Sequence, residues 1–191
     1  MLQNLSLNPL VFVVKNFFKT DECDALIKQA EDVGFSDAPV TVAQGVHVML
    51  KDVRDNTRVI VDNPSFLAEF EDALQNIVPP SYKEYKYLGV NSRFRFYKYT
   101  DGQTFKTHMD GSYKPNADTK SIYTALIYLS DDFNGGGTSF YNEDGSLRFT
   151  VNAEKGTLLV FKHNQLHSGD PVLDGVKYVV RTDLMYTNKG V

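Results

Sequence analysis

Two histidines and one aspartate have the residue types and spacing of a metal site. His108 and Asp110 are separated by one residue at the end of an expected strand, where side chains alternate, so both can project to one side. Taken alone, this pair is better explained as a hydrogen-bonded turn. His167 lies just beyond the apolar run 156–161 and supplies a third ligand if the fold brings the strand ends together. Two imidazoles and one carboxylate with open positions are typical of non-haem Fe(II) oxygenases.

Lys177 is a second residue with chemical potential. It follows His167 by ten residues and stands in the otherwise apolar stretch 176–180, where an unpaired lysine would be costly to bury. An Fe(II) site that activates oxygen needs an electron donor, commonly 2-oxoglutarate, whose distal carboxylate needs a cation. Lys177 is a candidate for that cation. The alternative is an edge-strand lysine whose amine reaches water.

The elements that must position these residues are short strands separated by turn signals, from residue 91 onward. Turn residues at 101–102, 134–137 and 144–145 separate several of these strands. We expect strands at 93–99, 105–108, 122–129, 138–141, 157–161 and 176–186. This pattern, preceded by helices, predicts a β-sandwich or jelly roll with a helical flank.

The first 90 residues predict one strand and two helices. A buried strand is expected at 10–14, followed by a helix at 21–33 with Thr20 as its N-cap and Gly34 as its stop. A second helix is expected to begin at Asn63-Pro64 and to end before Pro79. Both helices should pack on one sheet.

Length, charge and cysteine content exclude several classes of protein. The 191 residues suit one domain with a hydrophobic core, and the net charge of −4 disfavours nucleic-acid binding, which usually needs a basic face. A single cysteine, Cys23, cannot form an intrachain disulfide and is typical of a reducing compartment. The apolar run 10–14 is too short for a signal core or a membrane span. We therefore expect a cytoplasmic protein with no membrane association.

Three blocks of sequence resemble the prolyl-4-hydroxylase-like 2-oxoglutarate/Fe(II) dioxygenases, and they occur in that family's order. They are 91–112, with His108-Met109-Asp110; 126–140, with Leu126-Ile127-Tyr128-Leu129 and Gly135-Gly136-Gly137-Thr138; and 167–183, with His167-Ser168-Gly169, Lys177 and Arg181-Thr182-Asp183. The resemblance implies a mainly β fold, a double-stranded β-helix (jelly roll) with flanking N-terminal helices. It implies a single domain over 1–191, with the N-terminal strand and supporting helices in 1–90 and the catalytic core in 91–187.

The resemblance also implies roles for individual residues. His108, Asp110 and His167 would hold iron, and Lys177 would pair with the far carboxylate of 2-oxoglutarate. Further cosubstrate contacts would come from Tyr99, Tyr128 and Thr138, although both tyrosines could equally be core residues. The sequence departs from the family pattern at Gly137, where an acidic residue is common, and at Phe161, where tryptophan is frequent. Neither departure touches the expected ligands.

The implied activity is that of an Fe(II)-, 2-oxoglutarate- and O2-dependent hydroxylase that releases succinate and CO2, with ascorbate as a candidate reductant. The substrate is a residue of a protein, prolyl in several family members, or a small molecule. The alternative is a catalytically silent jelly-roll module that binds a metal or a ligand. A nucleic-acid oxygenase is disfavoured by the net charge.

Arginines indicate an anionic substrate. On the expected strand 176–186, Arg181 shares a face with Lys177, and Asp183 follows in the same row; Arg95 lies on the strand 93–99 that leads to the metal. These three residues are candidate substrate contacts, with an Arg181–Asp183 ion pair as the alternative. Arg54 and Arg58 are expected near the mouth, unless they pair with neighbouring aspartates.

Three remaining residues with chemical potential are assigned no role. His163 is expected in a polar turn and not as a ligand. His47 is expected at the surface or the pocket rim. Cys23 is expected in the core.

Overall fold

A large antiparallel sheet forms the centre of the molecule. The structure, a computed structural model, describes residues 3–8, 10–41, 47–62 and 64–189. The strand order is β1-β2-β15-β11-β18-β9-β6-β3, with β8 pairing β18 and β7 pairing β8. The bounds are β1 (Gln3–Asn8), β2 (Val11–Lys15), β15 (Leu158–Lys162), β11 (Thr119–Tyr128), β18 (Lys177–Thr187), β9 (Arg93–Tyr99), β6 (Thr57–Asp62), β3 (Ser36–Asp37), β7 (Ser81–Tyr82) and β8 (Tyr85–Val90).

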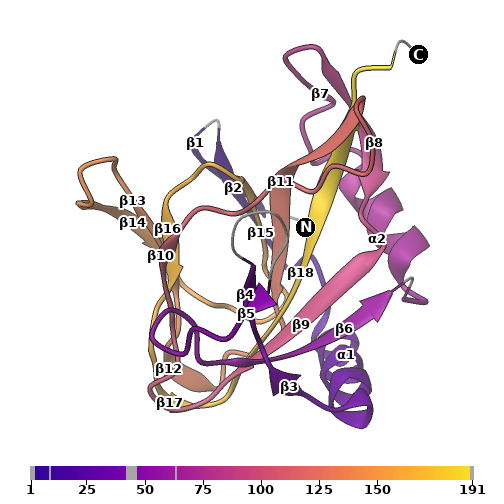
Figure 1. The fold of residues 1–191 in the computed structure, drawn as a ribbon. Helices are drawn as coiled ribbons and strands as arrows, with labels where there is room; N and C mark the ends of the chain where they lie inside the picture. Colours follow the sequence, from indigo (N-terminus) through magenta and orange to yellow (C-terminus); the bar gives the residue numbers. More distant parts are fainter. Residues whose placement is uncertain (1–2, 9, 42–46, 63, 190–191) are drawn as a thin grey trace.

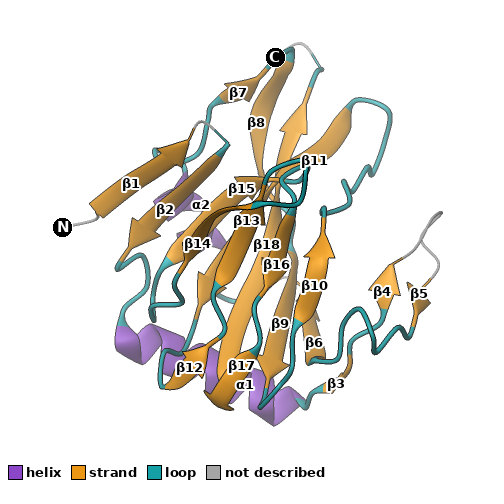
Figure 2. Cartoon of the chain, turned by 90° about the vertical axis from the view of Figure 1, so that its left-hand side faces the viewer, coloured by secondary structure: helices purple, strands orange, loops and turns teal. Residues whose placement is uncertain are grey.

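A smaller antiparallel sheet faces the large one and completes a jelly roll, so the expected mainly β fold is confirmed (Figures 1 and 2). Its order is β10-β16-β13-β14, with β10 (Phe105–His108), β16 (His167–Gly169), β13 (Thr138–Tyr141) and β14 (Leu147–Val151). Two short pairs lie outside both sheets: β12 (Phe133–Gly135) with β17 (Val172–Gly175), and β4 (Val40–Thr41) with β5 (His47–Val48).

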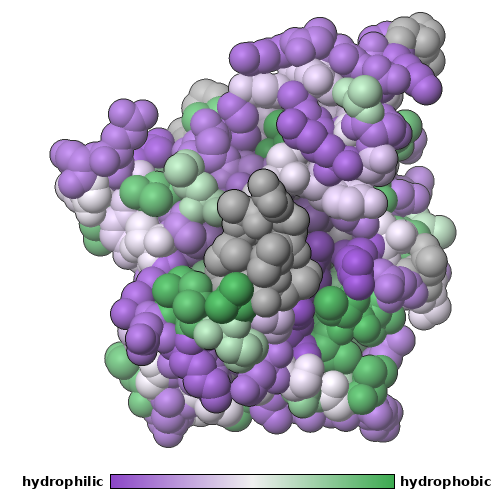
Figure 3. Space-filling model, viewed as in Figure 1, coloured by the Kyte–Doolittle hydropathy of each residue, from purple (hydrophilic) through white to green (hydrophobic). Residues whose placement is uncertain are grey.

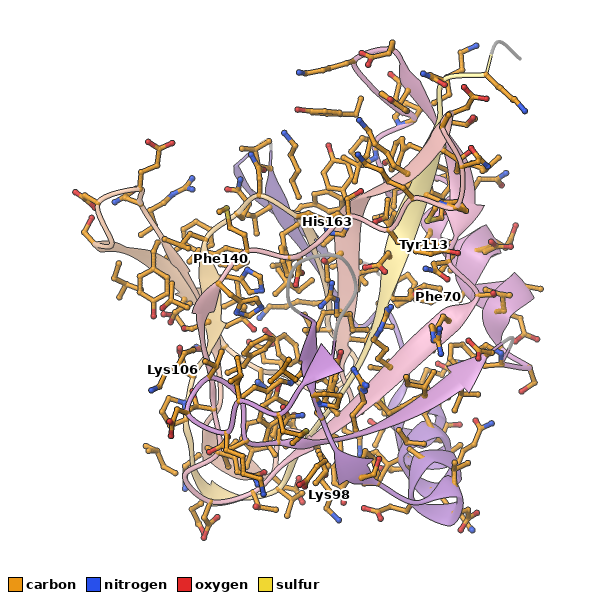
Figure 4. The ribbon with its side chains drawn as sticks, in the orientation of Figure 1. Phe70, Lys98, Lys106, Tyr113, Phe140 and His163 are labelled. Atoms are coloured by element: carbon orange, nitrogen blue, oxygen red, sulfur yellow. The ribbon has the colours of Figure 1, made fainter. Side chains whose placement is uncertain are left out.

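Both helices pack on the face of the large sheet that points away from the small sheet, as expected (Figure 1). They are α1 (Thr20–Val33) and α2 (Leu67–Leu74). Strand alternation separates two apolar layers: Phe94 and Phe96 of β9 pack with the helices, whereas Tyr97 and Tyr99 face the small sheet. Figure 4 labels one residue of each layer, Phe70 on α2 and Phe140 on β13.

The helix ends differ in part from expectation. The N-cap of α1 is Lys19, not Thr20, because Lys19 is extended and its backbone N–H donates to the Glu22 carboxylate at 2.7 Å. Gly34 ends the helix as expected, with a positive φ of 94°. The helix α2 begins at Leu67 and not at Asn63-Pro64, since Leu67 N–H closes a tight turn onto the Pro64 carbonyl at 3.0 Å; Asn63 lies outside the described residues.

No helix in the described ranges has both the length and the apolar composition that crossing a membrane requires.

Candidate active site

Strand pairing brings the three expected metal ligands together. His108 ends β10, His167 begins β16, and the two residues lie opposite each other in the β10–β16 register. Asp110 follows β10 by two residues, and one ligand atom from each of the three side chains lies within 4.8 Å of the others. The Nε2 atom of His108 is 3.6 Å from Asp110 Oδ1, and that of His167 is 3.9 Å from Asp110 Oδ2.

Backbone carbonyls orient both imidazoles. The Nδ1 atom of His108 lies 2.7 Å from the Lys106 carbonyl, and that of His167 lies 2.9 Å from the Gln165 carbonyl. Because a carbonyl can only accept, each Nδ1 carries the proton and each Nε2 presents its lone pair to the site. Phe105 stacks on the His108 ring at 3.6 Å between centroids, which holds that ring in place.

Asp110 is buried and ionised. Burial would raise its pKa, but the Arg181 guanidinium, whose Nη1 lies 2.9 Å from Asp110 Oδ1, and the neighbouring imidazoles hold the pKa well below its usual range. The Thr124 hydroxyl donates to Asp110 Oδ2 at 2.5 Å. Burial lowers the pKa of His167 to about 4, so this imidazole is neutral. Two imidazoles and one carboxylate fit a divalent iron ion.

A cavity next to these ligands contains most of the other expected site residues. Tyr99, Thr138, Lys177 and Arg181 line it together with His108, Asp110 and His167. Tyr128 is joined to this wall because its hydroxyl donates to Thr138 Oγ1 at 2.7 Å. The inner face of β18 thus presents Lys177 and Arg181 to one cavity, as strand alternation predicts.

Lys177 lines this cavity and is only 3% exposed. Its nearest described partners are aromatic: Nζ is 5.1 Å from the centre of the Tyr99 ring and 5.7 Å from that of Tyr128. Within the described part of the chain it forms no ion pair with a carboxylate. Burial lowers the pKa of Lys177 to about 8, with Asp170 opposing the shift. A buried cation that faces a cavity fits a ligand carboxylate.

The expected substrate residues form an ion-pair network. Arg181 Nη2 and Arg95 Nη1 each lie 3.3 Å from a different oxygen of Asp183. The alternative Arg181–Asp183 pair is therefore present, and Arg181 pairs with Asp110 as well. Arg95 and Asp183 lie beside the cavity wall and contact Arg181 rather than lining the cavity.

Sequence reasoning missed the roles of Thr124 and His163, whereas it placed Arg54 near the mouth with an aspartate pair as the alternative. His163, labelled in Figure 4, lies in a turn, as expected, but is only 6% exposed. Its ring nitrogens lie within hydrogen-bond distance of the Thr124 and Ser121 hydroxyls. Arg54 is buried and lines the cavity, and its Nε donates to Asn56 at 2.6 Å; no aspartate among the described residues pairs with it. The sequence shows that these residues are polar, but it does not show that the fold buries them beside the site.

Three other expectations have separate outcomes. Arg58 is half-buried on β6, opposite Tyr97 of β9. Cys23 is fully buried in the core, as expected. The side chain of His47 lies outside the described residues.

Comparisons with known proteins agree with this geometry. The family model of the 2OG-Fe(II) oxygenase superfamily matches residues 94–182, a range that contains all three candidate ligands and Lys177. The chain is 26% identical over 205 residues to "Probable prolyl 4-hydroxylase 6" of Arabidopsis thaliana, covering 93% of this chain and 69% of that protein. It is 25% identical over 203 residues to "Probable prolyl 4-hydroxylase 3" of the same plant, covering 91% and 68%.

Solved structures share the fold. A prolyl hydroxylase from Trichoplax adhaerens, in complex with a hypoxia inducible factor peptide fragment, has a TM-score of 0.71 at 18% identity and covers 94% of this chain and 84% of its own. The viral collagen prolyl hydroxylase of Paramecium Bursaria Chlorella virus-1 has a TM-score of 0.63 at 17% identity and covers 94% and 97%. In its matched core and its His-Asp-His geometry, the chain is similar to the 2OG-Fe(II) oxygenase superfamily, whose members use Fe(II), 2-oxoglutarate and O2, and it resembles the prolyl 4-hydroxylases.

Proposed function

We propose that the protein is an Fe(II)- and 2-oxoglutarate-dependent dioxygenase that hydroxylates a prolyl residue of a protein or peptide. The observation that carries this proposal is the convergence of His108, Asp110 and His167, whose ligand atoms lie within 4.8 Å of one another. Beside them lies a buried lysine, Lys177, which forms no ion pair with a carboxylate in the described ranges. The prolyl substrate is taken from the names of the curated relatives, which are probable prolyl 4-hydroxylases.

Each residue of the site has a specific task. His108, Asp110 and His167 hold iron, which supplies the redox chemistry that couples oxidation of 2-oxoglutarate, to succinate and CO2, with hydroxylation of the substrate. Lys177 binds the distal carboxylate of 2-oxoglutarate. Tyr99 and Thr138 supply hydroxyl groups along the same wall, and the Tyr128 hydroxyl orients that of Thr138. The aromatic walls exclude water from the reacting groups.

The rest of the proposal concerns partners and location. Arg181 lines the cavity at its metal end and contacts the substrate. Asp183, which pairs with both Arg181 and Arg95, holds the Arg181 guanidinium in place. The acidic chain, with a net charge of −4, disfavours a nucleic-acid substrate. We further propose a cytoplasmic location, supported by the single cysteine, which is buried and free.

The test is succinate formation by the purified protein with Fe(II), 2-oxoglutarate and proline-containing peptides, together with a mass gain of one oxygen on the peptide. We expect His108→Ala to abolish both signals, because an iron site with one imidazole removed loses its geometry. Asn164→Ala, an exposed position in the turn before His167, is the matched control and should retain both. A protein that binds Co(II) yet forms no succinate above the blank would instead be the silent binding module.

A further inference from the structure

Arg54 is a buried cation on the wall of the active-site cavity. It is 5% exposed, and its guanidinium carbon lies 4.2 Å from the centre of the Tyr97 ring and 4.4 Å from that of Phe105. Its backbone forms a β-bridge with Phe105, so the segment that carries it is attached to the strand that carries His108. The side chain is therefore fixed in the cavity and is not a surface group folded inward.

The charge of Arg54 is oriented but not neutralised. Its Nε donates to the amide oxygen of Asn56 at 2.6 Å, and an amide aligns a guanidinium without cancelling its charge. Over the described ranges no carboxylate reaches ion-pair distance of Arg54, whereas Arg95 and Arg181 both pair with Asp183. Because a buried charge is retained only where a partner compensates it, an anion from outside the chain is the expected partner.

A charge count over the cavity wall gives the same result; this step rests on the proposed function. Arg54, Lys177 and Arg181 are cationic and Asp110 is anionic, so three positive charges against one negative leave two positive charges. Ferrous iron adds two positive charges and 2-oxoglutarate adds two negative ones, so the loaded cavity keeps its excess. The whole chain carries −4, which makes this local excess opposite in sign to the rest of the molecule.

Arg54 and Lys177 line one cavity, with Tyr99 close to both, but the other aromatic rings that they contact differ. The Phe105 ring lies between the Arg54 guanidinium and the His108 imidazole. Its centroid is 4.4 Å from the Arg54 guanidinium carbon and 3.6 Å from the centroid of the His108 ring. Lys177 instead contacts Tyr99 and Tyr128. The distal carboxylate of 2-oxoglutarate goes to Lys177 and its other carboxylate to the metal, so Arg54 remains for the substrate.

The described part of the face that Figure 3 shows has no continuous apolar surface. It is mostly hydrophilic, with apolar side chains in separate groups rather than one continuous surface (Figure 3). Polar and charged contacts are thus the expected source of substrate selectivity on this face.

We propose that Arg54 binds a carboxylate of the substrate beside the bond that is hydroxylated. The substrate class is therefore acid-bearing: either a peptide with Asp or Glu next to the target prolyl residue, or a free carboxylic acid. Asn56 holds the Nε atom, and the Tyr97 and Tyr99 side chains hydrogen-bond to the same guanidinium. These neutral groups orient the Arg54 cation without cancelling its charge, which suits a carboxylate ligand.

The experiment compares the affinity of the protein for carboxylate probes with its affinity for the corresponding amides. One pair is a proline peptide flanked by Glu or by Gln, and the other is N-acetylproline and N-acetylprolinamide. Binding is measured by calorimetry on protein loaded with Zn(II) and 2-oxoglutarate, which does not turn over. We expect at least one carboxylate probe to bind about tenfold or more tighter than the corresponding amide, the scale of a hydrogen bond to a charged group. The pair that shows the preference identifies the source of the carboxylate.

Two variants test whether Arg54 carries the preference. Arg54→Gln removes the cation, and Asn56→Asp places a carboxylate beside it in nearly the same shape, so each should reduce the preference to less than about twofold. Asn56→Asp retains the arginine and serves if Arg54→Gln fails to fold. Both variants should bind 2-oxoglutarate as the unmodified protein does.

Three results would overturn the proposal. The first is that neither carboxylate probe binds more tightly than the corresponding amide, including the case in which no probe binds. The second is that the preference survives in both variants. The third is that Arg54→Gln weakens 2-oxoglutarate binding as much as Lys177→Met, which would make Arg54 a cosubstrate residue. Failure of the unmodified protein to bind 2-oxoglutarate would contradict the proposed function itself.

Discussion

The Arg181 guanidinium and the Asp110 carboxylate form a buried ion pair, with Nη1 2.9 Å from Oδ1. The other carboxylate oxygen, Oδ2, accepts a hydrogen bond from Thr124 at 2.5 Å. Both oxygens of the candidate metal ligand therefore have a protein partner. The carboxylate is kept ionised and in a single orientation before any metal binds, so Arg181 and a divalent ion act on the same charge.

Arg181→Met should destabilise the metal-free protein, because it leaves Asp110 buried without a cationic partner. Breaking one side of such a buried pair costs about 3–5 kcal/mol of unfolding free energy. Mn(II) should then stabilise the variant more than it stabilises the unmodified protein, since the ion replaces the lost cation. Urea denaturation with and without Mn(II) measures both effects. Arg93→Met, which breaks an exposed pair with Asp62, is the control and should shift stability by less than about 1 kcal/mol. An equal gain from Mn(II) in both proteins would contradict the shared role of Asp110.

Lys177→Met should weaken 2-oxoglutarate binding without changing metal affinity. The ammonium serves the distal carboxylate and not the metal, so its loss should cost about 1.5–3 kcal/mol, or roughly 10–100-fold in Kd. The metal-free variant should be as stable as the unmodified protein or more so, because an unpaired buried cation is replaced by an apolar chain of similar length. Calorimetry with Mn(II) and with 2-oxoglutarate measures the two affinities separately. Equal loss of both would remove Lys177 from the cosubstrate subsite.

The affinity for 2-oxoglutarate should depend on pH through Lys177. Burial lowers the pKa of this amine from 10.5 to about 8 in the free protein, so it loses its proton as the pH rises through 8. Binding a carboxylate requires the ammonium form; hence the Kd should be flat below pH 8 and rise about tenfold per pH unit above it, with proton uptake on binding. Calorimetry at pH 7 and pH 9 in two buffers of different ionisation enthalpy measures that uptake. It should vanish in Lys177→Met.

The lowered pKa of Lys177 also determines how this residue's contribution to folding stability changes with pH. A lysine whose pKa is lower in the folded state than in the unfolded state opposes folding while it is charged in both states, below about pH 8. That cost declines as the pH rises from about 8 to 10.5, so the Lys177 contribution to stability becomes more favourable across this window. A decline in this contribution over the same window, relative to Lys177→Met, would contradict the assignment.

Strands bounded by turn signals could be predicted from the sequence, and strands with little apolar pattern could not. The strands β9, β10 and β13 have the predicted bounds, because each is bounded by turn signals. The strand β16, with three residues, and β14, which is half exposed, have too little apolar pattern to be recognised. His167 lies on β16, so its identification as a ligand depended on the order of motifs along the chain rather than on a recognisable strand.

The inner residues of the site were predictable only where strand alternation determines the face. Lys177 and Arg181 on one long strand are such a case. The local sequence Lys162-His163-Asn164 has the composition of a polar turn, and the turn is present, but tertiary packing against β11 buries the imidazole. Burial of that kind depends on contacts between distant segments, which a single sequence does not reveal.

His163 is joined to the candidate metal ligand by a chain of hydrogen bonds. The single hydroxyl proton of Thr124 goes to Asp110 Oδ2, so Thr124 Oγ1 can only accept from His163 Nδ1, at 3.1 Å. The Nε2 atom of His163 then accepts from the Ser121 hydroxyl at 2.8 Å. Burial lowers the pKa of His163, which favours the neutral imidazole that this arrangement requires.

If His163 acts on Asp110 through Thr124, the two residues should not have independent effects on metal binding. Thr124→Val and His163→Phe should each weaken Co(II) affinity, by about 10–100-fold for the threonine, which contacts the carboxylate. The double variant should lose no more than Thr124→Val alone, because the second substitution removes a partner that no longer acts. Calorimetric Co(II) titration gives the affinities, and the Co(II) absorption spectrum reports the ligand geometry. Thr182→Val, at a buried threonine bonded to the Asn91 carbonyl, is the control and should leave Co(II) binding unchanged. Losses that add in the double variant would show that His163 affects the site by a separate route, and an unchanged affinity in Thr124→Val would remove the threonine from it.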